Sequence, residues 1–341
     1  MKLLLISPFG LTCVLTVFSP IPAVSAEPDG AGKTVADSVA VVETDAAVET
    51  PAAAAETYLL RYRFQDGQVL RYKTDETMTM QAMVGSNRKE DVTRVRQTRR
   101  FRIEELNEDG SATVAMQFEH VRMELRANGG DPVIFDSSMA PNEVPATFRS
   151  AAHSLRQAAP RFVVETTGIP LNSASLADAP GDNTGEDEQG AAETPATAGF
   201  AIPLPDHPVA VGETWKTFLV VKLRSGPDFK RKVNLLQTYR LTGVDDGIAT
   251  IEFSTSVVGR LTPLEKGQLL QATPKGTATF DIAAGRLLTK ELIHDSTVFD
   301  AMGPNTLVTS VGRHTDRLLT DSSTEPRDDD VASDETPVSL R

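Results

Sequence analysis

A set of strand-like segments occurs twice along the chain, and this repeat limits the folds that the sequence can adopt. In both copies apolar residues alternate with polar ones, and Gly or Asp-Gly turns separate the runs. The matching segments are residues 67–70 and 212–215, 101–103 and 239–241, 109–114 and 246–251, and 162–171 and 280–287. The repeat predicts a mainly β, antiparallel fold of two related β units. The units can form sandwiches or one open, half-barrel-like sheet.

One helix is expected within the first unit, over residues 143–159. Phe148 and the apolar residues that follow it have helical spacing, and Pro160 ends the pattern. No counterpart is expected in the second unit, because residues 261–275 are few and include Pro263 and a second proline.

Acidic segments flank and separate the two units. The chain of 341 residues has a formal net charge of -13, which argues against a nucleic-acid-binding protein. Residues 27–56, 174–199 and 321–341 carry -6, -6 and -5, whereas the two units (57–173 and 200–320) together carry +3. One-sided charge and few aromatic residues predict that the three acidic segments are disordered.

The first 26 residues resemble a secretory signal peptide. Lys2 precedes an apolar stretch at residues 3–18, and Val24-Ser25-Ala26 offers small residues for cleavage. We therefore expect an exported protein, periplasmic or extracellular, with no transmembrane segment in the mature chain. A retained membrane anchor and lipid modification of Cys13, the only cysteine, are the alternatives.

The segment Leu204 to Trp215 is the most distinctive one in the chain. It reads Leu204-Pro205-Asp206-His207-Pro208-Val209-Ala210-Val211-Gly212-Glu213-Thr214-Trp215. It resembles a family of exported bacterial proteins of unknown function that share an L-P-x-x-P-V-x-V-G-[ED]-x-W element after an early G-x-x-L-x-Y strand, here residues 67–72. The resemblance implies a β-rich envelope or secreted domain and no catalytic residue. Trp215, the only tryptophan, is expected either to pack in the core or to stack on a ligand.

A row of arginines is the main candidate for binding. Its members share one face of a predicted strand, opposite Val95, Phe101 and Ile103; they are Arg94, Arg96, Arg100 and Arg102. The second unit repeats the pattern in part with Lys230, Lys232 and Arg240. Such a row can bind phosphate, anionic lipid headgroups or acidic polysaccharide. Alternatively, carboxylates of adjacent strands such as Asp75 and Glu119 neutralise it, or the acidic tails fold back onto it.

Sequence patterns that identify an enzyme, a metal site or a cofactor site are missing. His314-Thr315-Asp316 places two candidate metal ligands on one strand face without a third, so polar surface is the expected role. In His294-Asp295-Ser296, neighbouring side chains of a strand point to opposite faces, which argues against a catalytic triad. No catalytic residue, metal ligand or cofactor is therefore predicted.

Two functions lead for such a protein, and a third, a hydrolase, would require a cleft that gathers His and carboxylate side chains from distant strands. The first is a non-enzymatic envelope module that binds an anionic polymer or another envelope protein through the arginine row. The second is a carrier of a lipid or other apolar ligand in the concavity of a curved sheet. An apolar stripe on one strand forms either the ligand wall or the core; its residues are Leu70, Tyr72, Met78 and Met80.

Overall fold

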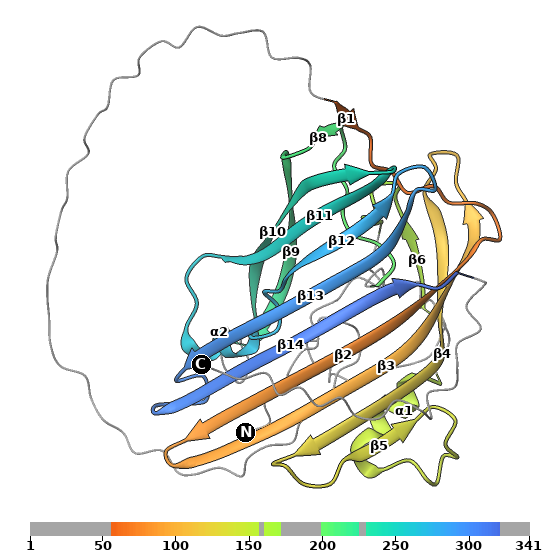
Figure 1. The fold of residues 1–341 in the computed structure, drawn as a ribbon. Coiled ribbons are helices and arrows are strands. Elements are labelled where there is room, and N and C mark those ends of the chain that lie inside the picture. The colour runs from red at the N-terminus through yellow and green to blue at the C-terminus, as the bar shows by residue number, and fades with distance from the viewer. Residues whose placement is uncertain (1–55, 157–159, 172–198, 225–229, 321–341) are drawn as a thin grey trace, which may run out of the picture.

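The computed structural model describes residues 56–156, 160–171, 199–224 and 230–320, and it shows one open antiparallel sheet of twelve strands (Figure 1). The strands of the first half are β2 (Val69–Val84), β3 (Asn87–Leu106), β4 (Ala112–Ala127), β5 (Val133–Asp136), β6 (Arg161–Val164) and β7 (Pro170–Leu171). Those of the second half are β9 (Thr214–Arg224), β10 (Lys230–Asp245), β11 (Ile248–Val258), β12 (Lys275–Asp281), β13 (Arg286–Phe299) and β14 (Thr306–Leu318). The mainly β, antiparallel prediction is confirmed.

The two halves of the sheet repeat the same strand order. Across the sheet the order is β7-β6-β4-β3-β2-β14-β13-β12-β11-β10-β9, with β5 paired to β4. The segments matched in the sequence place β9 to β13 as equivalents of β2, β3, β4, β6 and β7. The units therefore follow one another in the same direction and join where β14 pairs with β2. They form one continuous sheet, which decides between the two arrangements left open by the sequence.

The register at the matched positions is also repeated. Leu70 pairs with Phe101 in the first unit, and Trp215 pairs with Tyr239 in the second. All four side chains belong to one buried cluster that extends across both units. Alternation along the strands directs these residues to one face, and their polar neighbours point to the other face.

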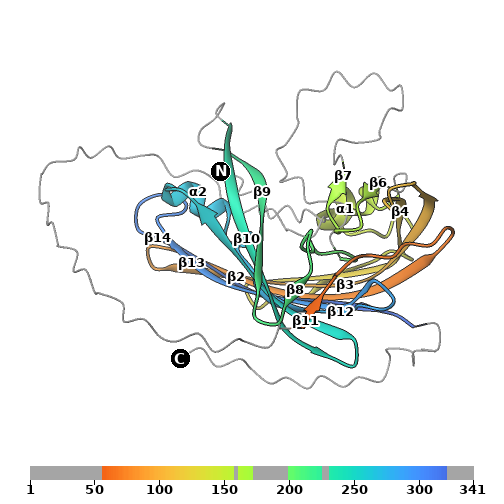
Figure 2. The same cartoon turned by 90° about the horizontal axis from the view of Figure 1, so that it is seen from above.

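Two short helical segments lie on the concave face of the curved sheet (Figure 2). In the first unit a 3-10 turn (Ala146–Phe148) leads into helix α1 (Arg149–Ser154), which is shorter than the helix predicted over residues 143–159. Pro145 has an extended conformation and precedes the turn. The predicted helix is therefore shortened at its N-terminal end, because proline is tolerated at the start of a helix but not in its interior. Residues 157–159 lie outside the described part of the chain.

The second unit has a counterpart helix, so the prediction that it lacks one was wrong. Helix α2 (Pro263–Gln268) lies between β11 and β12, the place that α1 occupies between the equivalent strands β4 and β6. Pro263 is the first helical residue, where its missing N–H is not needed. Thr262 and Glu265 form a capping box, in which each side chain accepts a hydrogen bond from the other's backbone N–H.

The N-terminal part of the described chain crosses the concave face before it enters the sheet. Strand β1 (Thr57–Tyr58) pairs with β8 (Val209–Ala210), and the residues after β1 bury Leu60, Tyr62 and Phe64 in the main core. This crossing segment, residues 59–68, touches both units. The Tyr62 backbone N–H donates to Thr166 O, and that of Arg63 donates to Gly285 O.

The acidic segments predicted to be disordered, within 27–56, 174–199 and 321–341, lie outside the described residues apart from Glu56 and Gly199. The signal peptide predicted at residues 1–26 also lies outside them. In the described part of the chain no helix is long and apolar enough to cross a membrane.

Candidate functional site

The arginine row lies on the convex face of the sheet, opposite the helices. Arg94, Arg96, Arg100 and Arg102 are all exposed on β3. Arg96 Nε lies 3.7 Å from Asp75 Oδ1, and Arg100 Nε lies 4.0 Å from Glu119 Oε1. The carboxylates of β2 and β4 thus share this face with the row, so that its charge is partly neutralised.

A bulge in β4 brings Glu119 to the arginines. The pairing of β3 with β4 shifts between Thr98, opposite His120, and Arg99, opposite Phe118, so Glu119 is an extra residue in its strand. A bulge redirects side chains and interrupts alternation. Glu119 Oε2 accepts hydrogen bonds from Arg71 Nε at 2.8 Å and Arg71 Nη2 at 2.6 Å.

Trp215 lies in the main core. Its ring is 7% exposed and stacks on Tyr239 with the ring centroids 5.6 Å apart. The indole Nε1 donates a hydrogen bond to Pro203 O at 3.0 Å, which joins the entry loop of the Leu204–Trp215 segment to β9. The geometry therefore agrees with core packing, one of the two roles expected for Trp215, because its side chain belongs to the main apolar cluster.

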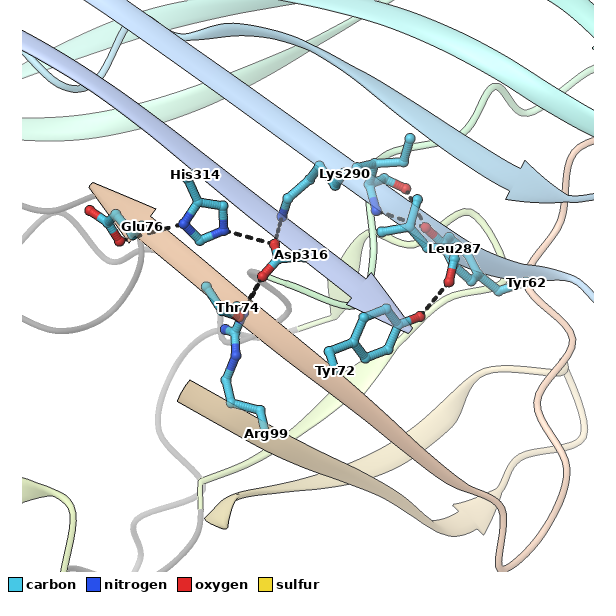
Figure 3. A network of polar contacts seen from close by, with 10 residues as sticks. Tyr62, Tyr72, Thr74, Glu76, Arg99, Leu287, Lys290, His314 and Asp316 are labelled. Carbon is cyan, nitrogen blue, oxygen red and sulfur yellow. Dashed lines mark hydrogen bonds and ion pairs between the residues drawn. The ribbon is translucent and has the colours of Figure 1, made fainter. Parts of the chain in front are cut away.

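A buried group of charged side chains occupies the concave face where the two units join (Figure 3). Asp316 on β14 is fully buried, and four side chains surround it. Asp316 Oδ1 accepts from Thr74 Oγ1 at 2.6 Å and from Arg99 Nη2 at 2.8 Å. Asp316 Oδ2 lies 2.9 Å from His314 Nε2 and 3.0 Å from Lys290 Nζ. We call these five residues the Asp316 network.

The Asp316 network draws its members from both units. Thr74 lies on β2, Arg99 on β3, Lys290 on β13, and His314 and Asp316 on β14. His314 Nδ1 also lies 3.4 Å from Glu76 Oε2 on β2. The network thus spans the junction at which β14 pairs with β2, and it fixes the relative position of four neighbouring strands.

Charges around Asp316 keep it ionised. Burial alone would raise the pKa of this carboxyl group, but Lys290, His314 and Arg99 outweigh that effect and hold the pKa well below its ordinary value. For His314, burial disfavours the protonated ring, whereas Asp316 and Glu76 favour it and raise the pKa above 6.5. A buried carboxylate with several cationic partners is stable only while those partners are present.

The sequence prediction for residues 314–316 is corrected in one respect. His314 and Asp316 do share one strand face, but they are 2% and 0% exposed and are not polar surface. Within the described ranges no group of three or more His, Cys, Asp or Glu side chains is arranged to hold a metal ion. Arg99 and Lys290 were not recognised as site residues. Arg99 has the same parity as Phe101 and Ile103, which places it on the buried face.

His294 lies beside the network on the same face. It pairs with Gly312 across β13 and β14, and its ring occupies the space that a Cβ at Gly312 would need. The ring Nε2 is 3.1 Å from Ser310 Oγ, and burial lowers the pKa of His294. Asp295 is exposed on the opposite face, as strand alternation predicted, so these residues form no triad.

Apolar residues of the concave face gather in separate clusters. Under α1 lies a cluster of Val121, Met123, Phe135, Val144, Phe148 and Ala152. Beside α2 lies a cluster of Val221, Leu223, Val233, Leu235 and Leu269. Leu70 and Tyr72 of the predicted stripe belong to the main core. Met78 and Met80 are buried too, but they belong to none of the four apolar clusters that the described residues form.

Comparisons with known proteins give little further information. No family model matches the chain, and no curated protein matches it. Three solved chains match. One, from a structure described as "Lipid-protein interactions in lipovitellin", is 12% identical, with a TM-score of 0.39. The match covers 75% of this chain and 25% of that chain, and at this TM-score it does not establish a common fold.

The central strip of the concave face combines apolar and polar chemistry. It lies on β2, β3, β14 and β13, between the cluster under α1 and the cluster beside α2, and it begins at the Asp316 network. Its buried members beyond the network are Met78, Met80, Thr93, Gln97, His294 and Ser310. Methionines adapt their shape to apolar groups, and the polar members can hydrogen-bond a ligand's polar end. This central strip is the candidate site.

Proposed function

We propose that this protein is a non-enzymatic binding protein that holds an apolar or amphiphilic molecule against the central strip. The observation that carries the proposal is the position of Met78 and Met80, which are buried on the concave face outside the apolar clusters. In such a site the methionines contact the apolar body of the ligand. Thr93, Gln97, His294 and Ser310 orient its polar end, as in ligand sites that combine apolar walls with a few polar groups.

The Asp316 network supports this site by keeping the curved sheet in one shape. Each of the four strands at the junction contributes to it, and a buried carboxylate paired with several cations resists rearrangement. A preformed concave surface reduces the entropy that ligand binding must overcome. In the exported location that residues 1–26 predict, such a protein would carry a poorly soluble molecule through an aqueous compartment.

The first experiment is native mass spectrometry of the purified full chain, followed by mass spectrometry of its organic extract. We expect a stoichiometric apolar or amphiphilic adduct. A delipidated sample should bind a fluorescent fatty acid with saturation. Replacing Met78 and Met80 with Ser should weaken that binding by about tenfold or more, since an unpaired hydroxyl buried against the apolar body of the ligand costs roughly 1–3 kcal/mol.

A methionine elsewhere on the same face provides the control. Met116 is partly buried against the main core, so Met116→Ser should lower stability and leave fatty-acid affinity unchanged. A chain with no extractable ligand and no saturable binding of the fluorescent fatty acid would exclude the proposal. Equal loss of affinity in the Met116 and Met78 variants would also contradict it.

Binding of an anionic envelope polymer by the arginine row is the second candidate function. The exposure of all four arginines supports it, whereas the nearby Asp75 and Glu119 weaken it. The test is salt-dependent binding of polygalacturonate. Replacing Arg94 and Arg102 with Gln should reduce this binding if the row is the site. Unchanged binding would exclude it.

A further inference from the structure

The convex face of the sheet edge carries an apolar patch bordered by lysines. β9, the last strand of the sheet, and its neighbours β10 and β11 present alternate side chains outward. The residues that alternate with them along the strands, such as Leu219, Val221 and Leu235, point inward to the cluster beside α2. Apart from Arg240 and Glu252, which lie opposite each other on this face, the outward set considered is Lys216, Phe218, Val220, Lys222, Lys232, Asn234, Leu236, Thr238, Ser254, Ser256 and Val258. We call it the outer patch.

Apolar side chains lie at the centre of the outer patch. Phe218 is 67% exposed and pairs with Leu236 across β9 and β10. In the next row Asn234 lies between Val220 and Val258, which are about half exposed. Large apolar side chains grouped on an exposed strand face indicate a contact surface, whereas single ones do not.

Lysines lie at both ends of this apolar centre. Lys216 precedes Phe218 on the same face, and Lys222 lies directly opposite Lys232. On the outward face of β11 the acid Glu252 follows the outer patch, where it lies opposite Arg240. The patch itself carries lysines, whereas the formal net charge of the chain is -13.

The equivalent surface of the first unit has a different character. The offset of 145 between the matched segments 67–70 and 212–215 aligns Phe218 with Lys73 and Val220 with Asp75. In the first unit these positions are charged, and Asp75 contacts Arg96. Of the two units, only the second therefore combines an apolar centre with lysines. This combination lies at the β9 edge of the sheet.

We infer that the outer patch docks the protein onto a membrane surface that contains anionic phospholipids. Phe218, Val220 and Val258 enter the boundary between headgroups and acyl chains, and Lys216 and Lys232 attract the lipid phosphates. Apolar insertion combined with several cations is the arrangement by which peripheral proteins bind such surfaces. The inference does not depend on the proposed function, because docking requires no ligand in the central strip.

The test is flotation of the full chain with phosphatidylcholine vesicles, with or without an equal part of phosphatidylglycerol. We expect binding to the anionic vesicles that decreases as salt is raised. Lys216→Gln and Lys232→Gln should each weaken binding about fivefold, which corresponds to about 1 kcal/mol per cation. Phe218→Thr should weaken binding by a similar factor or more and should leave its salt dependence unchanged, because the lysines remain.

Matched variants separate the outer patch from other surfaces. Phe299 on β13 is 71% exposed, so Phe299→Thr removes an equally exposed phenylalanine outside the patch and should leave binding unchanged. Arg94→Gln removes a cation from the convex face of the first unit and should also have little effect. The N-terminal apolar stretch is present in every variant, so differences between variants report the patch. Circular dichroism melts confirm that each variant is folded.

Four results would overturn the inference. The first is equal flotation of the chain with neutral and anionic vesicles. The second is equal loss of binding in the Phe299 and Phe218 variants. The third is concentration-dependent dimerisation in sedimentation velocity that Phe218→Thr abolishes, together with no flotation, because the patch would then be an interface between copies of the chain. Glycerol phosphate in solution should compete poorly, and effective competition would indicate a site for small anions instead.

Discussion

Gly168 and Gly285 occupy equivalent turns of the two units, and each lies against the same crossing segment of chain. Gly168 lies beside the ring of Tyr62, and Gly285 lies beside the backbone N–H of Arg63. Both glycines have positive φ, +78° and +62°. A Cβ at either one would overlap the crossing segment, so the repeat uses glycine here for close approach as well as for the turn.

This relationship predicts that Gly285→Ala destabilises the fold more than an ordinary turn glycine does. Gly247 has a similar φ of +76°, but a Cβ at Gly247 would meet no atom within 4 Å, so Gly247→Ala tests the effect of φ alone. We expect the Gly247 variant to lose roughly 1–2 kcal/mol. The Gly285 variant should lose a further 1–3 kcal/mol, approximately, from overpacking against Arg63. Urea unfolding of both variants measures the difference. Equal losses would show that the crossing segment moves away from the added methyl group with no loss of stability.

The sequence predicted the repeat and the strand faces, because turns and alternation depend on local residues. Leu70, Phe101, Trp215 and Tyr239 lie in the core where their period-two pattern placed them. Helix α2 was missed because Pro263 was treated as a helix breaker, although the Thr262-Glu265 capping box gives it a favourable first position. The sequence pattern Thr-Pro-x-Glu at residues 262–265 could have indicated the start of this helix.

The Asp316 network was beyond sequence reasoning for a different reason. Its members come from four strands that are far apart in the chain, and only the pairing of β14 with β2 brings Asp316 beside Thr74 and Arg99. Alternation could have indicated that Arg99 is a charged residue on the apolar side of β3. It could not have supplied the partner, since pairing between distant strands is not encoded locally.

Removal of the central carboxylate should strongly destabilise the protein. In Asp316→Asn, Arg99 and Lys290 stay buried without their counter-charge, and breaking a buried ion pair in this way costs about 3–5 kcal/mol. Asp75→Asn is the matched control, because its side chain is 51% exposed and its contact with Arg96 is 3.7 Å. That variant should lose less than about 1 kcal/mol. Urea unfolding at neutral pH measures both, and similar losses would contradict a structural role for the network.

The two buried histidines should make stability depend on pH in opposite directions. The pKa of His314 is raised above 6.5 in the folded state, so its contribution is complete below 6.5 and is lost as pH rises through the folded pKa. The pKa of His294 is lowered, so the fold loses stability as pH falls below 6.5 and the unfolded chain binds the proton more readily.

Single variants should separate these two effects. In His314→Gln, the decline of stability above pH 6.5 should be smaller than in the parent protein. In His294→Gln, the decline below pH 6.5 should be smaller. The free energy of unfolding in urea, measured from pH 5 to pH 8, provides both slopes. His153, which is exposed, is the control, and His153→Gln should leave the profile unchanged. Reversed slopes for the two variants would contradict the burial and partners assigned to them.

Trp215 provides a direct test of its place in the core, because it is the only tryptophan in the chain. Its burial against Tyr239 predicts blue-shifted emission and weak quenching by iodide in the folded protein, with strong quenching after unfolding in urea. Trp215→Phe keeps an aromatic ring beside Tyr239 but loses the hydrogen bond to Pro203 O. It should cost about 1 kcal/mol, since a partly buried acceptor loses its donor. Strong iodide quenching in the folded state would mean that the ring is accessible and would restore Trp215 as a candidate for ligand stacking.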